Sequence, residues 1–306
     1  MTLQDLEYII AVDQHRHFAR AAESCHVTQP TLSMQLRKLE EELGVLIFDR
    51  SSKPVVPTDI GKRIIQQAGR VLQEARFLKD MAMDARVNLS GDLKIGIIPT
   101  LAPFLLPAFL KVVAKELPYL KLRVSELVTE EIVKRMQNGD LDMGILVTPV
   151  PEVAMRVVPL FYEEFFVYSS HDFDKEFILP EEIDPTELWL LEEGHCFRSQ
   201  ILNLCELRRK ISPRFEYEAG SIETLKRLVD QNQGVTILPE LAVKDFSTEE
   251  KRRLKKFQPP APVREVSLVT LPHYARERLI DSLAQLIRQD HALHATHEAG
   301  TIVPIT

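Results

Sequence analysis

Apolar side chains recur every three or four positions in three successive runs at the start of the chain, a period typical of α-helices. The first run begins at Leu3 and ends near His15, and the second begins at Phe18 and stops around Cys25. Thr28 is placed to cap a third helix, and Pro30 is tolerated in the first turn of that helix. The apolar face of the third helix is Leu32, Leu36, Leu39 and Leu43. Two short helices joined by a tight turn predict a helix-turn-helix.

The outward face of the third predicted helix is polar. It presents Gln29, Thr31, Ser33, Gln35 and Arg37. Amide, hydroxyl and guanidinium groups suit base edges and phosphates in DNA. Residues 47–58, which follow Gly44, are interpreted as a β-hairpin wing that carries Arg50 and Lys53 towards the DNA backbone. An interaction helix with a solvated charged face is the alternative, but the order of helices and basic wing favours DNA binding.

From Asp59 the pattern changes to a single long helix whose apolar positions alternate at spacings of four and three. These positions are Ile64, Ala68, Val71, Ala75, Leu78 and Ala82. This heptad spacing is typical of two paired helices, whereas a helix packed on its own domain would need a wider apolar stripe. We therefore expect a linker helix over residues 59–88 and at least a homodimer. Asn88, Ser90 and Gly91 predict a hinge into the next domain.

Strand and helix patterns alternate through residues 89–306. Strands are predicted at Leu93–Ile98, Leu120–Glu126, Leu141–Val147, Val157–Tyr168, Glu187–Leu191, Phe215–Ala219, Gly234–Leu238 and Glu265–Leu271. Helices are predicted at Leu105–Glu116, Glu130–Gln137, Ser221–Asn232 and Ala275–His291. Such alternation favours parallel sheets in an α/β fold, with a size that suits two small subdomains. Polar groups at strand ends and helix starts are candidates for a ligand cleft between the subdomains: Thr100, Thr129 and Ser221. Each of them is also a plausible helix cap.

Composition agrees with a cytoplasmic globular protein. The chain has 306 residues, of which 45% are hydrophobic and 27% charged, and it lacks a basic N-terminal region followed by an apolar core. No apolar run reaches the length of a membrane span. A net charge of −7 would argue against binding of nucleic acid if it were spread evenly along the chain. Residues 1–86 contain 12 basic and 12 acidic side chains, so the whole negative excess lies in the remainder.

Two of the three cysteines, Cys196 and Cys205, lie nine residues apart. Gly194 ends the preceding apolar run, and the helical spacing that follows places Cys196 near a helix N-terminus. Amide groups and the positive end of the helix dipole favour a thiolate there, and His195 and Arg198 can add positive charge. Nine residues of helix separate the two cysteines by roughly 13 Å, whereas a disulfide needs Cα atoms within about 7 Å. A disulfide would thus require the helix to unwind, although two ordinary buried thiols remain an open alternative.

Four segments resemble the N-terminal signature of LysR-type transcriptional regulators. They are Phe18–Ala22, Val27–Ser33, Leu36–Gly44 and Leu46–Arg50. The resemblance implies that double-stranded DNA is contacted by Gln29, Pro30, Thr31, Ser33, Arg37 and Arg50. Cys25 then becomes a small core residue. The implied organisation is a winged helix-turn-helix (1–58), a linker helix (59–88) and a regulatory domain of periplasmic-binding-protein type (89–306), whose subdomain I comprises 89–161 plus 266–295 and whose subdomain II comprises 162–265.

The regulatory domain resembles the peroxide-sensing branch of the same family through Ile95–Thr100 and through Leu191–Arg198 followed by Cys205. This resemblance implies that Cys196 attacks hydrogen peroxide and that Cys205 then forms a disulfide with it. The implied assisting residues are Thr100, Thr129, His195 and Arg198. It also implies activation of oxidative-stress genes through RNA polymerase, a homotetramer, and resetting by glutaredoxin or thioredoxin. Ser199 stands where the familiar motif has an Asp, so a charged arm is missing.

Two rival interpretations keep parts of this picture. A LysR-type regulator could bind a small organic effector in the inter-subdomain cleft, with both cysteines structural. A thiol peroxidase would explain the cysteines but leave the DNA-binding domain without a use, so we expect no enzyme. His291, His294 and His297 could suggest a metal site, but they lack further ligands and are interpreted as a solvated tail. No metal or other cofactor is expected.

Overall fold

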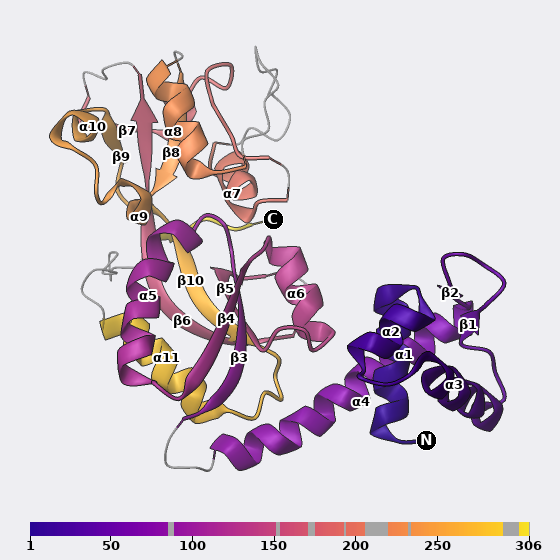
Figure 1. Ribbon diagram of the computed structural model, residues 1–306. Coiled ribbons are helices and arrows are strands. Elements are labelled where there is room, and N and C mark those ends of the chain that lie inside the picture. The colour runs from indigo at the N-terminus through magenta and orange to yellow at the C-terminus, as the bar shows by residue number, and fades with distance from the viewer. Residues whose placement is uncertain are drawn as a thin grey trace. The chain divides into compact units, whose positions relative to one another are not determined.

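The computed structural model describes residues 1–84, 89–150, 154–170, 175–192, 194–205, 220–231, 234–289 and 300–305 (Figure 1). These residues form two compact units, one built mainly from residues 1–84 and the other from residues 89–136 and 141–305. The predicted strand Phe215–Ala219, the predicted hinge residue Asn88 and the three C-terminal histidines lie outside the described residues.

The N-terminal unit contains the predicted helix-turn-helix, wing and long helix. Its elements are α1 (Leu3–His15), α2 (Phe18–Ser24), α3 (Gln29–Leu43), β1 (Phe48–Asp49), β2 (Val56–Pro57) and α4 (Asp59–Asp84). Residues from all of these helices and from the wing share one core, in which Ile9, Leu32 and Ile47 have no exposed surface. A Cβ on Gly61 would lie 2.0 Å from the Ile47 carbonyl oxygen, so the close approach of α4 to the wing requires glycine.

Two local details explain where α3 begins and ends. Gly44 adopts a left-handed conformation (φ 69°) at the C-cap, which L side chains rarely adopt, and this stops the helix. Thr28 is the N-cap residue as predicted, but its side chain makes no capping hydrogen bond. Its hydroxyl instead pairs with the Thr31 hydroxyl at 2.8 Å. The prediction of a side-chain cap at Thr28 was therefore wrong, because the neighbouring hydroxyl competes for the bond.

The regulatory unit is organised around a mixed sheet. Its strands are β3 (Gly91–Ile97), β4 (Leu120–Glu126), β5 (Met143–Thr148), β6 (Arg156–Ser169), β7 (Phe177–Ile178), β8 (Val235–Pro239), β9 (Leu254–Phe257), β10 (Pro262–Thr270) and β11 (Thr301–Ile302). Its helices are α5 (Ala102–Glu116), α6 (Thr129–Gln137), α7 (Cys196–Leu204), α8 (Ile222–Gln231), α9 (Glu240–Val243), α10 (Thr248–Arg252) and α11 (Glu277–Gln289), with a 3₁₀ turn at Pro180–Glu182. The strand order is β4-β3-β5-β10-β6-β9-β7, with β8 on β6 and β11 on β10.

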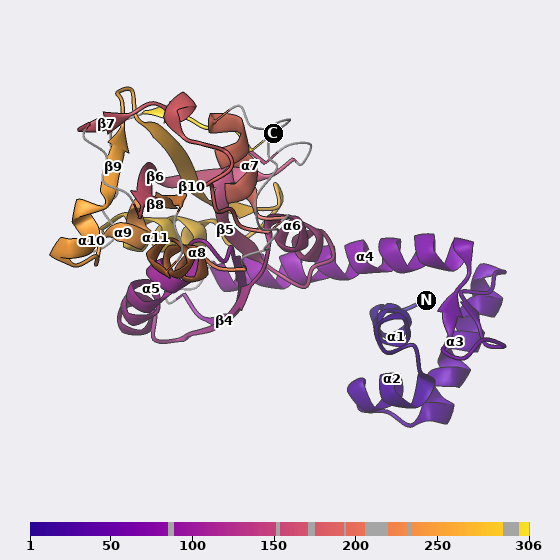
Figure 2. The ribbon, with the colours of Figure 1, turned by 90° about the horizontal axis from the view of Figure 1, so that it is seen from above.

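The expectation of parallel sheets was right for only part of this unit. Strand β3 is parallel to β4 and β5, as helix–strand alternation predicts. Strand β10 is antiparallel to both β5 and β6, and β8 and β9 are antiparallel to β6. These antiparallel partners gather on the 14-residue strand β6, whose first part pairs with β10 and whose last part pairs with β8 and β9 (Figure 1, Figure 2). The subdomain boundaries stated above stay a prediction.

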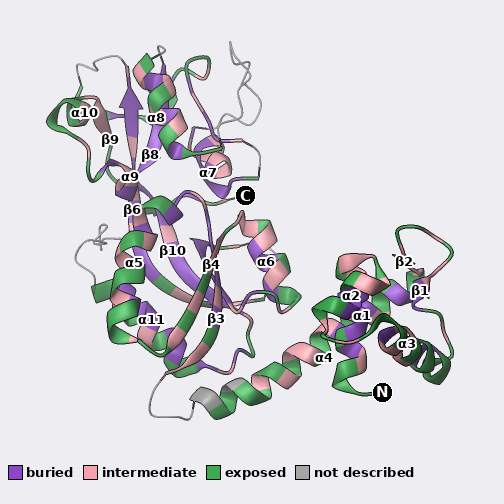
Figure 3. Cartoon of the chain, viewed as in Figure 1, coloured by how far each residue is buried: buried purple, intermediate pink, exposed green. Residues whose placement is uncertain are grey.

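The predicted strand Glu187–Leu191 is not a strand. It makes isolated bridges, one of them between Leu188 and Val235, flanked by hydrogen bonds at Trp189 and Glu187. Its apolar character instead reflects burial, since Leu188, Leu190 and Leu191 belong to the core beside β6 and β8. The short elements β7, β9, α9, α10 and β11 escaped prediction because each is too short to show a period. In Figure 3 the strands β5, β8 and β10 are largely buried, while exposed residues lie along the helices and loops.

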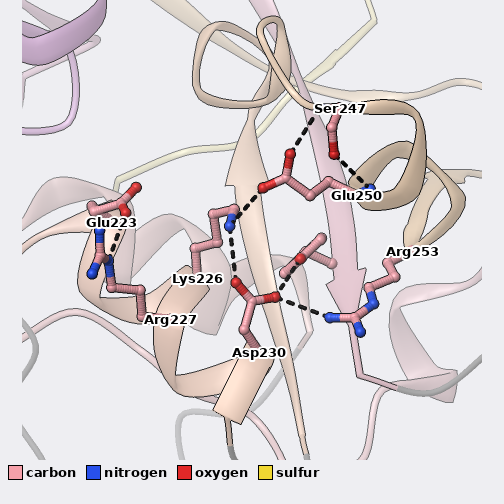
Figure 4. Close-up of polar contacts among 8 residues, drawn as sticks. Glu223, Lys226, Arg227, Asp230, Ser247, Glu250 and Arg253 are labelled. Atoms are coloured by element: carbon pink, nitrogen blue, oxygen red, sulfur yellow. Dashed lines mark hydrogen bonds and ion pairs between the residues drawn. The ribbon is translucent and has the colours of Figure 1, made fainter.

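A network of charged side chains joins α8 to α10 and β6 (Figure 4). The Lys226 ammonium lies 2.9 Å from an Asp230 carboxylate oxygen and 2.8 Å from a Glu250 oxygen. Asp230 also accepts hydrogen bonds from Tyr168 at 2.5 Å and from Arg253 at 3.0 Å. Because several of these groups share partners, the network fixes α8 more firmly than separate surface pairs would.

This network predicts a specific acid sensitivity. Hydrogen bonds from Lys226 and Ser247 lower the pKa of Glu250 from 4.5 to about 2. A lowered pKa in the folded state means that Glu250 stabilises the fold above pH 4.5, and that this contribution is lost as pH falls towards 2. We expect Glu250→Gln to flatten the fall of the urea midpoint over that window. The exposed pair Glu223–Arg227 supplies the control, because Glu223→Gln should leave the pH profile as it is in the unchanged protein.

Candidate functional site

The residue Cys196 opens helix α7, as the sequence predicted. Gly194 turns the chain with φ 90°, His195 is the N-cap residue, and Arg198 donates its amide to the His195 carbonyl at 3.0 Å. Cys196 is buried, with 7% of its surface exposed. The helix N-terminus therefore presents a cysteine to the protein interior and not to bulk solvent.

The centre of the site is Arg264, which stands on β10 and has no exposed surface. Its Nε donates to a Glu163 carboxylate oxygen at 2.7 Å, and its terminal nitrogens donate to the Thr100 hydroxyl at 2.9 Å and to the Thr100 carbonyl at 3.3 Å. Its guanidinium also lies 5.1 Å from the centre of the Phe197 ring. Arg264 thus holds the loop after β3, the carboxylate on β6 and the first turn of α7 around one positive charge.

The reactivity of Cys196 depends on a competition between burial and this charge. Burial raises the pKa of the Cys196 thiol, while the Arg264 guanidinium, a hydrogen bond from Thr129, and the amides of Phe197 and Cys196 lower it. The Thr129 hydroxyl oxygen is itself buried and has no hydrogen bond of standard geometry within the described residues. It is therefore close enough to act on the sulfur, yet it keeps capacity for a small polar molecule placed there.

The Arg264–Glu163 pair supports this arrangement. Burial raises the pKa of the Glu163 carboxyl, which Arg264 and the amide of Leu241 counteract by pairing with its two oxygens. Neither residue was singled out from the sequence. A signal was present, because Glu163 stands inside the apolar run predicted as a strand and Arg264 directly precedes another. Charged residues in such runs are rare unless they are paired.

The other sequence-predicted residues fall into different surroundings. His195 is buried with Nε2 3.5 Å from a Glu192 oxygen, and Arg198 donates to the Leu191 carbonyl at 2.7 Å. Both contacts lie in the loop that precedes α7, and their part in the chemistry stays a prediction. Ser221 is exposed and accepts the Thr224 amide at 3.2 Å, so it acts as a helix cap.

The second cysteine, Cys205, is the C-cap residue of α7 and is also buried. Burial, together with the Glu181 carboxylate, raises the pKa of its thiol to about 12. Both thiols are free, and the helix between them is continuous. The predicted helical separation of roughly 13 Å therefore applies, and the two sulfurs cannot bond in this conformation.

The predicted DNA-contacting residues lie on α3 and the wing. Gln29, Pro30 and Arg37 are exposed, while Thr31 and Ser33 are half-buried. The half-buried Arg50 is engaged inside its own unit: it lies 2.7 Å from a Glu40 oxygen and packs over the Phe18 ring. Contact of these residues with DNA stays a prediction.

Neither a membrane helix nor a metal cluster is found in the parts of the chain that the structure describes. No helix there is both long and apolar enough to cross a bilayer. No group of three or more His, Cys, Asp or Glu side chains gathers there in a way that could hold a metal ion.

Comparisons with known proteins give a consistent result. Residues 3–62 match the lysR family of bacterial regulatory helix-turn-helix proteins, and residues 87–292 match the LysR substrate binding domain. The chain is 36% identical over 297 residues to a hydrogen peroxide-inducible genes activator of Dickeya chrysanthemi, covering 96% of this chain and 97% of that one. It is 38% identical over 294 residues to the DNA-binding transcriptional dual regulator OxyR of Escherichia coli K12, covering 94% and 95%.

A solved structure is similar over the same length. Full-length OxyR from Pseudomonas aeruginosa, in a variant with one cysteine changed to aspartate, matches with a TM-score of 0.77 and 36% identity. The match covers 96% of this chain and 100% of that one. Both the N-terminal and the regulatory unit therefore have counterparts in a single solved chain.

The position of Arg264 makes a testable prediction about thiol reactivity. Arg264→Met should raise the pKa of Cys196 and slow its alkylation at a fixed pH by about tenfold, which corresponds to one pKa unit. It should also destabilise the fold by about 3–5 kcal/mol, because Glu163 would be left buried and unpaired. Iodoacetamide labelling mapped to Cys196, together with urea unfolding, measures both effects.

The double variant Arg264→Met/Glu163→Gln separates the two roles of the arginine. Removing both charges should recover most of the lost stability, while Cys196 remains slow to alkylate. Full recovery of the alkylation rate in the double variant would contradict the assignment of Arg264 as the source of positive charge at the thiol.

Proposed function

Since this chain belongs to the LysR family of bacterial transcriptional regulators, we propose that it is a DNA-binding regulator that senses hydrogen peroxide through Cys196 and Cys205. The observation that carries this proposal is the buried Cys196 on which the Arg264 guanidinium and the Thr129 hydroxyl act, with the Thr100 hydroxyl held by the same arginine. The similarity to peroxide-responsive activators supports it, since these relatives match nearly the whole chain.

The first chemical step follows from these surroundings. Hydrogen peroxide binds through the Thr100 and Thr129 hydroxyls, and the Cys196 thiolate attacks its nearer oxygen. The O–O bond breaks, the sulfur is oxidised to a sulfenic acid, and the departing hydroxide takes up a proton to leave as water. Arg264 stabilises both the thiolate and the charge that develops on the departing oxygen. His195 and Arg198 assist by holding the loop before α7.

The second step couples formation of the disulfide to a change in the conformation of α7. The Cys205 thiol condenses with the Cys196 sulfenic acid, so that an S–S bond forms, the S–OH bond breaks and water leaves. Because α7 separates the two sulfurs by roughly 13 Å, the helix unwinds for this bond to form. Refolding of this segment changes the surface of the regulatory unit and thereby the spacing of the DNA-reading units. One peroxide is sensed per oxidation cycle, so the protein acts as a sensor and not as an enzyme.

The partners follow from the same assignment. The face formed by Gln29, Pro30, Thr31, Ser33 and Arg37, with Arg50 at the wing, contacts promoter DNA in the cytoplasm. A homodimer forms through α4, and two dimers make a homotetramer that engages RNA polymerase. Glutaredoxin or thioredoxin reduces the disulfide. The effector-binding alternative has no observation of its own in its favour, and the relatives that match nearly the whole chain are named for hydrogen peroxide.

A peroxide titration tests the chemistry directly. After stoichiometric hydrogen peroxide, thiol trapping and peptide mass spectrometry should find a Cys196–Cys205 disulfide. Cys205→Ser should stop at the sulfenic acid, and Cys196→Ser should leave both other thiols reduced. Cys25→Ser is the matched control, because Cys25 lies in the N-terminal unit and should change nothing. Two free thiols at positions 196 and 205, in folded protein treated with peroxide, would refute the sensor.

The exposed apolar positions of α4 test the dimer. Val71, Leu78 and Met81 are 37%, 74% and 61% exposed within one chain, which is unusual for side chains of this size. We expect Leu78→Glu to shift the protein towards a lower oligomer at micromolar concentration in analytical ultracentrifugation, because it places a charge in the heptad seam. Lys79→Glu, one position along the same helix and outside the seam, should not change the sedimentation coefficient.

A further inference from the structure

The last described residues form a short strand, β11, that pairs with the start of β10. Strand β11 lies parallel to β10, with Thr301 beside Pro262 and Ile302 beside Val263. Thr301 donates to the Ala261 carbonyl at 2.9 Å, and Val303 donates to the Val263 carbonyl at 2.9 Å. This pairing fixes residues 300–305, here called the C-terminal clasp, against the strand that also carries Arg264.

The clasp then reaches α7 between the two cysteines. The Gln200 side-chain amide donates to the Val303 carbonyl at 2.8 Å, and the Asn203 amide donates to the Pro304 carbonyl at 2.8 Å. Figure 1 and Figure 2 both show the C-terminal end beside α7. The clasp thereby connects α7, which must unwind for the disulfide to form, to strand β10, which takes no part in that rearrangement.

Burial strengthens this contact. The Val303 side chain is 4% exposed and belongs to the same apolar core as Phe197, Ile201 and Cys205, three residues of α7 and its C-cap. Its neighbour Ile302 is 41% exposed and lies outside that core. Two adjacent apolar residues of one short segment therefore have different roles, and only Val303 is placed to stabilise α7.

Only one of the two polar atoms of the Gln200 side chain is hydrogen-bonded in this contact. It has no exposed surface, and its Oε1 atom has no hydrogen bond among the described residues, although its nitrogen is paired. A buried carbonyl without a partner costs free energy that it recovers on reaching water. Release of the clasp thus loses one hydrogen bond at Gln200 but relieves an unsatisfied oxygen, which keeps the contact reversible.

We propose that the C-terminal clasp is a latch that holds α7 helical in the dithiol state and sets both the rate and the equilibrium of disulfide formation. The inference rests on the proposed function for its second step, in which the sulfenic acid of Cys196 and the thiol of Cys205 give a disulfide and water. Gln200 and Asn203 lie between the two sulfurs, and their partners are carbonyls fixed beside β10. Unwinding of α7 therefore breaks the clasp contacts before the sulfurs can meet.

Paired single substitutions test the latch. Val303→Ala and Asn203→Ala should accelerate disulfide formation after peroxide by about tenfold and about threefold, while the rate of sulfenic acid formation at Cys196 stays within about twofold. The first step is followed by dimedone trapping in a Cys205→Ser background, and the second by quenched mass spectrometry. Ile302→Ala is the control on the same segment and should change neither rate. Equal disulfide rates in the two test variants and the unchanged protein would overturn the latch.

An equilibrium measurement removes the dependence on peroxide. In mixtures of reduced and oxidised dithiothreitol, Val303→Ala and Asn203→Ala should shift the Cys196–Cys205 equilibrium towards the disulfide by about tenfold and about threefold. Hydrogen exchange of the reduced protein should rise in the amides of α7 and not in those of β8. Absence of sulfenic acid after peroxide would refute the sensor alone, whereas an unchanged equilibrium in the exchange buffer would refute the latch alone. A uniform rise in exchange over the whole unit would also overturn the latch, since it would show general destabilisation.

Discussion

The ion pair between Arg264 and Glu163 is the interaction on which the candidate site depends. Both side chains have no exposed surface, and they connect β10 to β6, to the start of α9 through the Leu241 amide, and to the loop after β3 through Thr100. Taking two charges out of water costs several kcal/mol per ion, and their attraction offsets this cost only with good geometry. Apolar residues of similar size could fill the same space. The pair is therefore best explained by what it positions, which is a guanidinium beside a buried thiol.

This arrangement limits which reagents can react with the Cys196 thiol. Burial raises the pKa of the thiol even though Arg264, Thr129 and two amides oppose it. Cys196 is buried and its neighbour Phe197 has no exposed surface, so a large or charged reagent would have to displace packed side chains to reach the sulfur. A small oxidant with its own hydrogen-bonding groups can satisfy Thr129 and can approach the sulfur. Under the proposed function, selectivity for a small peroxide would come from access and positioning more than from a strongly acidic thiol.

The sequence predicted those parts of the molecule that local periodicity controls. Helices α3 and α4 and strand β4 were found from their apolar spacing, and α7 was located because a glycine precedes a helical pattern. Arg264 and Glu163 could not be paired in this way, since they lie 101 positions apart and meet only as register partners across antiparallel β6 and β10. That register depends on the antiparallel return of β10, which the alternation of strands and helices had suggested to be parallel. The prediction of a strand at Glu187–Leu191 was wrong for a different reason, because buried loop residues can be as apolar as those of a strand.

The same structure explains why α7 is the element able to change. It has nine residues, whereas isolated helices shorter than about 12–15 residues are marginal in water, so its stability comes from contacts with its neighbours. The surrounding elements are tied independently of it: β6 and β10 by their long register, and α8 by Lys226, Asp230 and Glu250. A change in bonding between Cys196 and Cys205 therefore acts on a short helix whose side chains donate hydrogen bonds to the loop before it and to the C-terminal clasp. Helix α7 lies between the two thiols and has little stability of its own. A disulfide between Cys196 and Cys205 can therefore change the conformation of this helix while the neighbouring strands keep theirs.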